Sequence, residues 1–371
     1  MRSNIQMRSQ SLPPELENRK LRRMKTLANM SSRAEPFTAL KGKTLETLAR
    51  LGGQNILRLP EGFAPAPLKL PVCFAATATY LRCYGRHRFF FENLSLTDSR
   101  VPRKAPRVRN VFFDPGDLKA AARVYEHFAT QVLSAEREED KIEVTMRSNQ
   151  MPINLVEILQ MEEPIQRESY VLSVAWVLKA LLAGLPDGIL GSTVLYQTLV
   201  DISYGRTPHI AGPQETDSCL EELDPWQHVQ TKAMALAILA LTSKKHLELI
   251  CGVLGLCEVL LHETQRTIEI EWWNSVRKRE RRPSWAAGLL DVDRLSRTLG
   301  PLLTNRVSEE DHYTEYSTIV VPGVLKAERV ARMLLETWRG VSRQLRWWER
   351  CGYPPARVVL KAGIEEVESK K

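Results

Sequence analysis

Apolar residues recur at helical spacing along most of this 371-residue chain, and this periodicity constrains the fold more than any other feature. Residues 117–133 show it most clearly: their apolar positions lie three and four apart, which places them on one face of a helix. Asp117 precedes them as a favourable N-cap. The β-like run of note is short, at residues 318–321. The predicted fold class is therefore all-α.

The same spacing, together with glycine and proline stop signals, predicts eight further helices. Residues 60–71, which lie between the helices expected at 44–51 and 72–84, carry several prolines and are expected to be extended. Residues 86–109 are rich in arginine and read as an irregular insertion. The further helices are expected over residues 44–51, 72–84, 169–185, 192–204, 227–241, 244–266, 291–299 and 325–348.

Positive charge is concentrated at the N-terminus. The chain has 52 Lys and Arg against 44 Asp and Glu, a net charge of +8. Residues 1–35 hold eight of the basic residues and three of the acidic ones, a net of +5, so the remainder is nearly balanced. This distribution argues against a nucleic-acid-binding domain and gives no reason to expect a nucleic-acid partner. A basic arm could instead make a peripheral contact with an anionic membrane.

The charge and proline patterns divide the chain into four expected parts. Residues 1–35 read as a disordered basic arm, 36–64 as an extension with a short helix, 65–350 as the main domain and 351–371 as a tail. The longest clean apolar run, residues 233–241, is nine residues long, far short of the roughly 20 that span a bilayer. The N-terminus has no apolar signal core and the six cysteines form no CxxC pair. These features predict a cytoplasmic protein with buried thiols, with the basic arm as its possible membrane contact.

The motifs of common enzyme classes are missing. The sequence contains no GxxxxGK[ST], GxGxxG, GxSxG or HExxH, and its seven histidines are scattered. We therefore expect no cofactor, no metal site and no catalytic centre of the chain's own. Two tryptophan pairs, 272–273 and 347–348, stand beside basic residues; base stacking would suggest RNA binding, but helix packing is the better interpretation. The basic run 277–282 is expected to be a solvated connector, with nuclear import or contact with anionic lipid as alternatives.

Three segments, taken in order, resemble the Rho GTPase-activating (RhoGAP) domain. They are NVFFDPG at residues 110–116, VAWVLKALLAGLPDGILG at 174–191 and LLDVDRLSRTLGPLL at 289–303. The family pattern is GIFRxxG, a helix ending in LKxxLRxLPxPL, and NKMxxxNLAxxFGPxLL. The resemblance covers about residues 65–350, and its motif residues look like the version of the domain common in filamentous fungi. It implies a RhoGAP-like helical bundle with loop insertions.

The resemblance also implies a function. Members of the family bind a Rho-type small GTPase and insert an arginine beside its GTP, which accelerates hydrolysis by about 10³–10⁵. The guanidinium neutralises charge that develops on the transferring phosphoryl group. The implied role is therefore signal transduction, with a Rho-family GTPase as partner and at most an activating effect on that partner.

Several family positions that contact GTP or the GTPase are changed in this chain. The arginine of the GIFRxxG loop falls on Phe113, and a phenyl ring cannot neutralise phosphate charge. The lysine of the LK pair is present as Lys179, but the arginine four residues later is Ala183. The first asparagine of the third motif falls on Gly288 and the second on Arg294. The resemblance implies GTPase-binding roles for Lys179, Phe113 and Arg294.

Three interpretations of this loss remain open. The domain could bind a GTPase without activating it. A nearby arginine could replace the missing one, and Arg109 and Arg107 are the candidates because they precede Phe113 by four and six residues. Four extended residues span about 13 Å, so Arg109 would need the loop to be re-threaded. Alternatively, the chain could be an all-α scaffold that no longer binds a GTPase.

Overall fold

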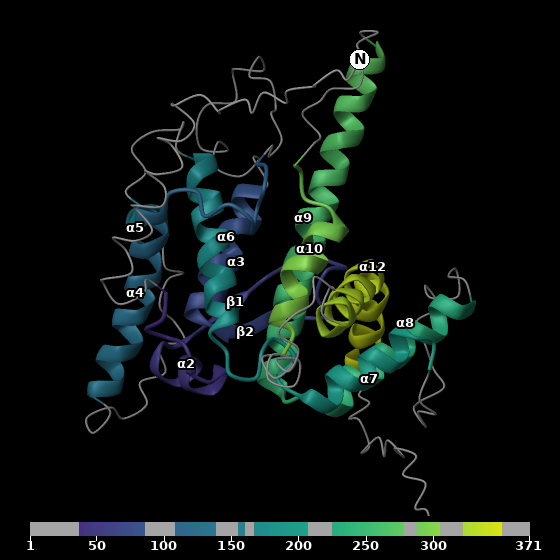
Figure 1. The fold of residues 1–371 in the computed structure, drawn as a ribbon, viewed down its shortest axis with the longest axis horizontal. Coiled ribbons are helices and arrows are strands. Elements are labelled where there is room, and N and C mark those ends of the chain that lie inside the picture. The colour runs from purple at the N-terminus through teal and green to yellow at the C-terminus, as the bar shows by residue number, and fades with distance from the viewer. Residues whose placement is uncertain are drawn as a thin grey trace, which may run out of the picture.

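A computed structural model of the chain is mostly helical (Figure 1). This confirms the predicted predominance of helices, with two short strands in addition. The structure describes residues 37–85, 108–138, 155–159, 167–206, 225–277, 288–304 and 322–350. The predicted basic arm, most of the arginine-rich insertion, the 278–282 part of the basic run, the β-like run 318–321 and the tail lie outside these ranges.

The described chain begins with a short helix and a strand pair. Helix α2 (Leu45–Leu51) starts after Thr44, whose side chain accepts a hydrogen bond from the backbone N–H of Thr47. Strands β1 (Gln54–Leu57) and β2 (Leu68–Pro71) pair antiparallel. The β-like run expected from the sequence was at residues 318–321, so this strand pair was not predicted. The residues of β1 do not alternate between apolar and polar, and the Leu–Lys–Leu alternation in β2 is only three residues long.

Three helices form one side of the fold, and the first of them packs against this strand pair. Helix α3 (Val72–Gly85) follows β2 directly and packs against α6 (Arg167–Ala183). Helix α4 (Leu118–Arg137) packs on the other side of α6 and also contacts the short α5 (Leu155–Leu159). As predicted, Asp117 caps α4. Helix α4 runs about one turn further than the sequence indicated.

The other side of the fold is built from the later helices. Helix α7 (Thr193–Ser203), capped by Ser192, contacts α8 (Pro225–Leu241). Helix α9 (Lys244–Arg277) is 34 residues long and extends past its neighbours (green in Figure 1). The helix expected from the sequence ended near residue 266, about three turns before the observed end at Arg277. Trp272 and Trp273 lie there with 44% and 67% of their surfaces exposed, so the helix-packing prediction is wrong for this pair.

Two helices form the last part of the described chain, and residues 305–321 between them lie outside the described ranges. Helix α10 (Val292–Leu299) begins after Asp291 and continues into a 3₁₀ turn, η5 (Gly300–Leu302). Helix α12 (Pro322–Arg350) packs against α10, η5 and α8. Trp348 is buried near its end, as the helix-packing prediction required.

One continuous hydrophobic core joins both sides. Helix α12 contributes the fully buried Trp338, whose indole N–H donates to the carbonyl of Phe63, 2.9 Å away. Three thiols predicted to be buried lie in this core, and burial raises the pKa of Cys73 and of Cys257 to about 12. Among the described helices, none is both long and apolar enough to cross a bilayer. Nor do three His, Cys, Asp or Glu side chains gather as a metal site anywhere in the described ranges.

Candidate functional site

The loop of residues 110–116 makes a tight turn that separates two adjacent phenylalanines. The backbone N–H groups of Phe113 and Asp114 both donate to the carbonyl of Asn110, at 2.9 and 3.0 Å. Asn110 and Phe112 have positive φ angles of 59° and 70°. A left-handed conformation is costly for a residue other than glycine, so the surroundings must hold it in place. As a result, Phe112 points into the core while Phe113 is 39% exposed.

The end of the loop is fixed to helix α6. The hydroxyl of the buried Ser173 accepts a hydrogen bond from the backbone N–H of Asp117, at 3.0 Å. Gly116 has a φ of +61°, and a Cβ atom there would lie 2.8 Å from the Cβ of Leu172. No larger residue fits this close approach between loop and helix.

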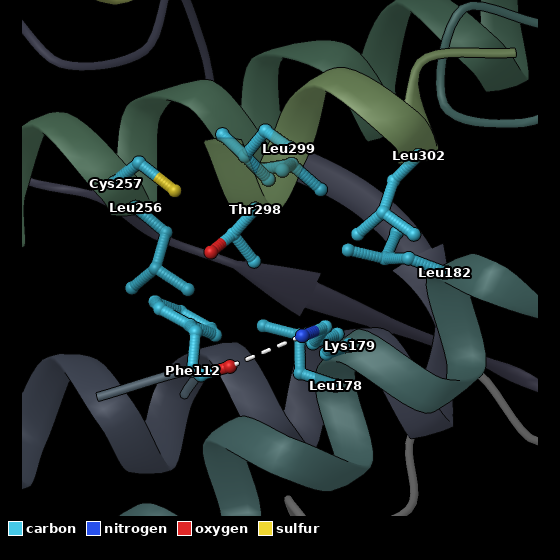
Figure 2. Close-up of a pocket in the computed structure, with 10 residues that line it drawn as sticks. Phe112, Leu178, Lys179, Leu182, Leu256, Cys257, Thr298, Leu299 and Leu302 are labelled. Carbon is cyan, nitrogen blue, oxygen red and sulfur yellow. Dashed lines mark hydrogen bonds between the residues drawn. The ribbon is translucent and has the colours of Figure 1, made fainter. Parts of the chain in front are cut away.

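Lys179 supports the centre of the loop from the same helix. Its ammonium donates to the carbonyl of Phe112 at 3.3 Å (Figure 2). The same ammonium lies 5.2 Å from the ring centroid of Trp176. Burial lowers the pKa of Lys179 below its usual value. The structure gives this ammonium no carboxylate partner among the described residues. Lys179 is therefore a half-buried cation whose charge is uncompensated there.

Helix α10 reaches the loop from the opposite side. The guanidinium of Arg294 donates from Nη1 to Oδ1 of Asn110 at 3.0 Å, and its Cζ lies 5.8 Å from the ring centroid of Phe113. Its Nε lies 3.8 Å from Oδ2 of Asp291, the N-cap of α10. The carbonyl of Gly288, a residue with φ of +94°, accepts from the backbone N–H of Asn110 at 2.9 Å. The α10 segment thus holds both the backbone and the side chain of Asn110.

A small apolar cavity lies beneath the loop. It has room for about one water molecule, so it offers no space for a cofactor or a small-molecule substrate. Helices α6, α9 and α10, η5 and the loop contribute its walls (Figure 2). Its lining residues are Phe112, Leu178, Lys179, Leu182, Val253, Leu256, Cys257, Thr298, Leu299 and Leu302. A ligand of this site would therefore bind to its surface rather than inside a pocket.

The structure brings together three of the residues singled out from the sequence. Phe113 and Arg294 lie side by side, and Lys179 contacts the same loop through the carbonyl of Phe112; we call these three residues the loop surface. Arg109 is exposed and lies beside Gly288; a Cβ atom on that glycine would be 3.6 Å from the Cβ and Cδ of Arg109. Arg107 lies outside the described residues.

Sequence reasoning missed the residues that shape the loop. Asn110 stands within the first motif, and asparagine tolerates positive φ better than most residues, so its type carried a usable signal. The residue type of Ser173 gave no signal of its role, because a serine within a helix usually points to solvent or to its own backbone. Gly288 was noted only as a missing asparagine, whereas its backbone anchors Asn110.

Comparison with known proteins identifies no relative: no family model, no curated protein and no solved structure matches this chain.

Proposed function

We propose that this chain is a divergent RhoGAP-like domain of small-GTPase signalling, which binds a Rho-type GTPase and stimulates its GTP hydrolysis weakly. One observation carries the proposal. The loop, Lys179 and Arg294 come from the three segments that carry the resemblance, and both side chains donate hydrogen bonds to the loop although the segments are far apart in sequence. In the RhoGAP family, these segments form the face that meets the GTPase.

The composition of the loop surface supports a protein partner. Aromatic residues and arginine are enriched at protein–protein interfaces, and this surface presents Phe113 beside Arg294. Lys179 adds a half-buried ammonium with no carboxylate among its described contacts. A carboxylate or phosphate oxygen from a partner would compensate that charge, and a charge-assisted hydrogen bond is stronger than a neutral one.

The residue at position 113 limits the expected activation. An arginine at the loop tip contributes about 10³–10⁵ to GTP hydrolysis in GAP-stimulated GTPases. Phe113 has no cationic group, so the stimulation by this chain is expected to fall well below that range. Binding with weak activation is the resulting expectation.

The test is a binding measurement against a panel of Rho-type GTPases, each loaded with GDP or with a non-hydrolysable GTP analogue. We expect affinity for the triphosphate state of at least one member. Lys179→Met should weaken that binding about tenfold or more, since a charge-assisted hydrogen bond contributes about 1.5–3 kcal/mol.

Lys244→Met is the matched control for this measurement. Lys244 is exposed in the first turn of α9, twelve residues before Leu256 of the cavity wall, which corresponds to about 18 Å along the helix. Its loss should leave affinity unchanged. If no GTPase of the panel binds in either nucleotide state, the proposed function is wrong and the chain is better described as an all-α scaffold.

A further inference from the structure

We propose that Arg294 supplies the guanidinium that the loop itself lacks, so that this domain stabilises the GTP phosphates from helix α10. This inference rests on the proposed function and goes beyond it, because it assigns the charge-neutralising role to one residue. It also differs from the substitution considered from the sequence, where Arg109 and Arg107 were the candidates.

The position of the guanidinium is the first observation. Its central carbon lies 5.8 Å from the centroid of the Phe113 ring, which is partly exposed at the loop tip. Position 113 is where the RhoGAP pattern has its arginine. A positive charge therefore lies beside the expected site, although it comes from a residue much later in the chain.

The second observation is how this guanidinium is held. Nη1 donates to the side chain of Asn110 at 3.0 Å, and Asp291 lies 3.8 Å from Nε. A guanidinium has five N–H donors, and Nη2 has no partner among the described residues. The side chain is thus oriented by its contacts with the loop and the helix cap while donors remain for a ligand. Such preorganisation is what electrostatic stabilisation of a transition state requires.

The third observation is that helix stability does not explain an arginine at this position. Arg294 is the third residue of α10, where the positive end of the helix dipole disfavours a cation and where glutamate is preferred. Arg297, one turn later, has an evident structural role because its Nε donates to Glu328 of α12 at 3.1 Å. Arg294 points instead to the loop.

The chemistry assigned to Arg294 is electrostatic. In GTP hydrolysis, the water oxygen forms a bond to the γ-phosphorus while the bond from that phosphorus to the β–γ bridging oxygen breaks. GDP keeps the bridging oxygen and its electron pair, and the protons of the water pass to the phosphate and the solvent. Negative charge rises on the oxygens around the γ-phosphorus, and the guanidinium of Arg294 would neutralise part of it.

Single-turnover GTP hydrolysis by the bound GTPase, at saturating concentrations of this chain, tests the inference. We expect wild type to accelerate hydrolysis measurably. Arg294→Ala should lose most of that acceleration even at saturating concentrations, where any loss of affinity no longer limits the rate. Arg294→Lys should not restore the rate, because an ammonium lacks the planar fork that binds phosphate oxygens in pairs. Arg297→Ala is the control and should behave as wild type.

A second variant separates catalysis from loop support. Phe113→Arg returns a guanidinium to the loop tip, and in the Arg294→Ala background it should recover the lost acceleration if position 113 and Arg294 reach the same phosphates. If wild type binds without acceleration, or if Arg294→Ala accelerates as well as wild type, the inference is wrong while the proposed binding stands. A loss of rate matched by an equal loss of affinity would make Arg294 a structural link and would also overturn it. Absence of any binding would instead overturn the proposed function.

Discussion

Gln344 of helix α12 is fully buried, and neither its amide oxygen nor its amide nitrogen has a hydrogen-bond partner among the described residues. A polar group buried without a partner costs about 1–3 kcal/mol. Gln344→Met keeps a similar length and volume without the amide. We expect it to raise the free energy of unfolding by about 1–3 kcal/mol, measured by urea denaturation.

The control for this residue is Gln197→Met on α7, where the side chain is exposed. That change should alter stability by less than about 0.5 kcal/mol. A loss of stability in Gln344→Met would contradict the prediction, because it would mean that the amide has a partner worth more than the apolar packing.

At the same scale, the candidate site was only partly predictable. Motif positions identified Phe113, Lys179 and Arg294, but they could not reveal that Arg294 bonds to Asn110, a residue 184 positions earlier. Local sequence does not encode such a contact, since it depends on how α10 packs in the finished fold. The positive φ of Phe112 escaped prediction for the same reason: its neighbours, rather than its residue type, impose it.

At the scale of elements, helix α9 packs closely against the segment that links β1 and β2. A Cβ atom at Gly255 would lie 2.5 Å from the carbonyl oxygen of Phe63 and 2.6 Å from Cδ1 of Leu59. Backbone cannot move aside as a side chain can. Gly255→Ala should therefore lower the free energy of unfolding by about 1–3 kcal/mol, as overpacking generally does, in thermal or urea denaturation.

Gly252→Ala in the same helix is the matched control. A Cβ at that position would meet the methyl end of Leu70 at 2.9 Å, and a side-chain end can shift. Both variants gain the same helix propensity, about 1 kcal/mol. The difference between them therefore reports the backbone contact. Equal stabilities would show that the 59–63 segment moves freely against α9.

Helix starts were more predictable than strands. The structure confirms Asp117 as an N-cap, and Thr44, Ser192 and Asp291 cap three other helices at their predicted starts, because a capping side chain acts within a few residues of its own position. The β1–β2 pair depends instead on bringing two four-residue segments together across an intervening loop. The alternation of Leu68, Lys69 and Leu70 in β2 is too short to indicate that pairing.

For the whole molecule, the continuous core has consequences for unfolding. Leu48 of α2 belongs to the same cluster as Trp338 of α12. We expect α2 to unfold together with the rest, although the sequence suggested an extension apart from the main domain. Leu48→Ala should lower stability by about 2–5 kcal/mol within a single cooperative transition.

Ile56→Ala is a suitable control, since Ile56 is 47% exposed and its truncation should have a small effect. Hydrogen exchange gives an independent measurement: the amides of α2 should exchange as slowly as those of α12. Early exchange of α2 alone would contradict the prediction and would make residues 36–64 a separately unfolding unit.

The bond between Asn110 and Arg294 also bears on the order in which a nascent chain can mature. Ribosomes add about 5–20 residues per second, so Asn110 is synthesised roughly 10–40 s before the arginine that orients its side chain. Until then, the loop has its contacts with α6 but none with α10. A polypeptide released before residue 288 would therefore lack one side of the loop surface.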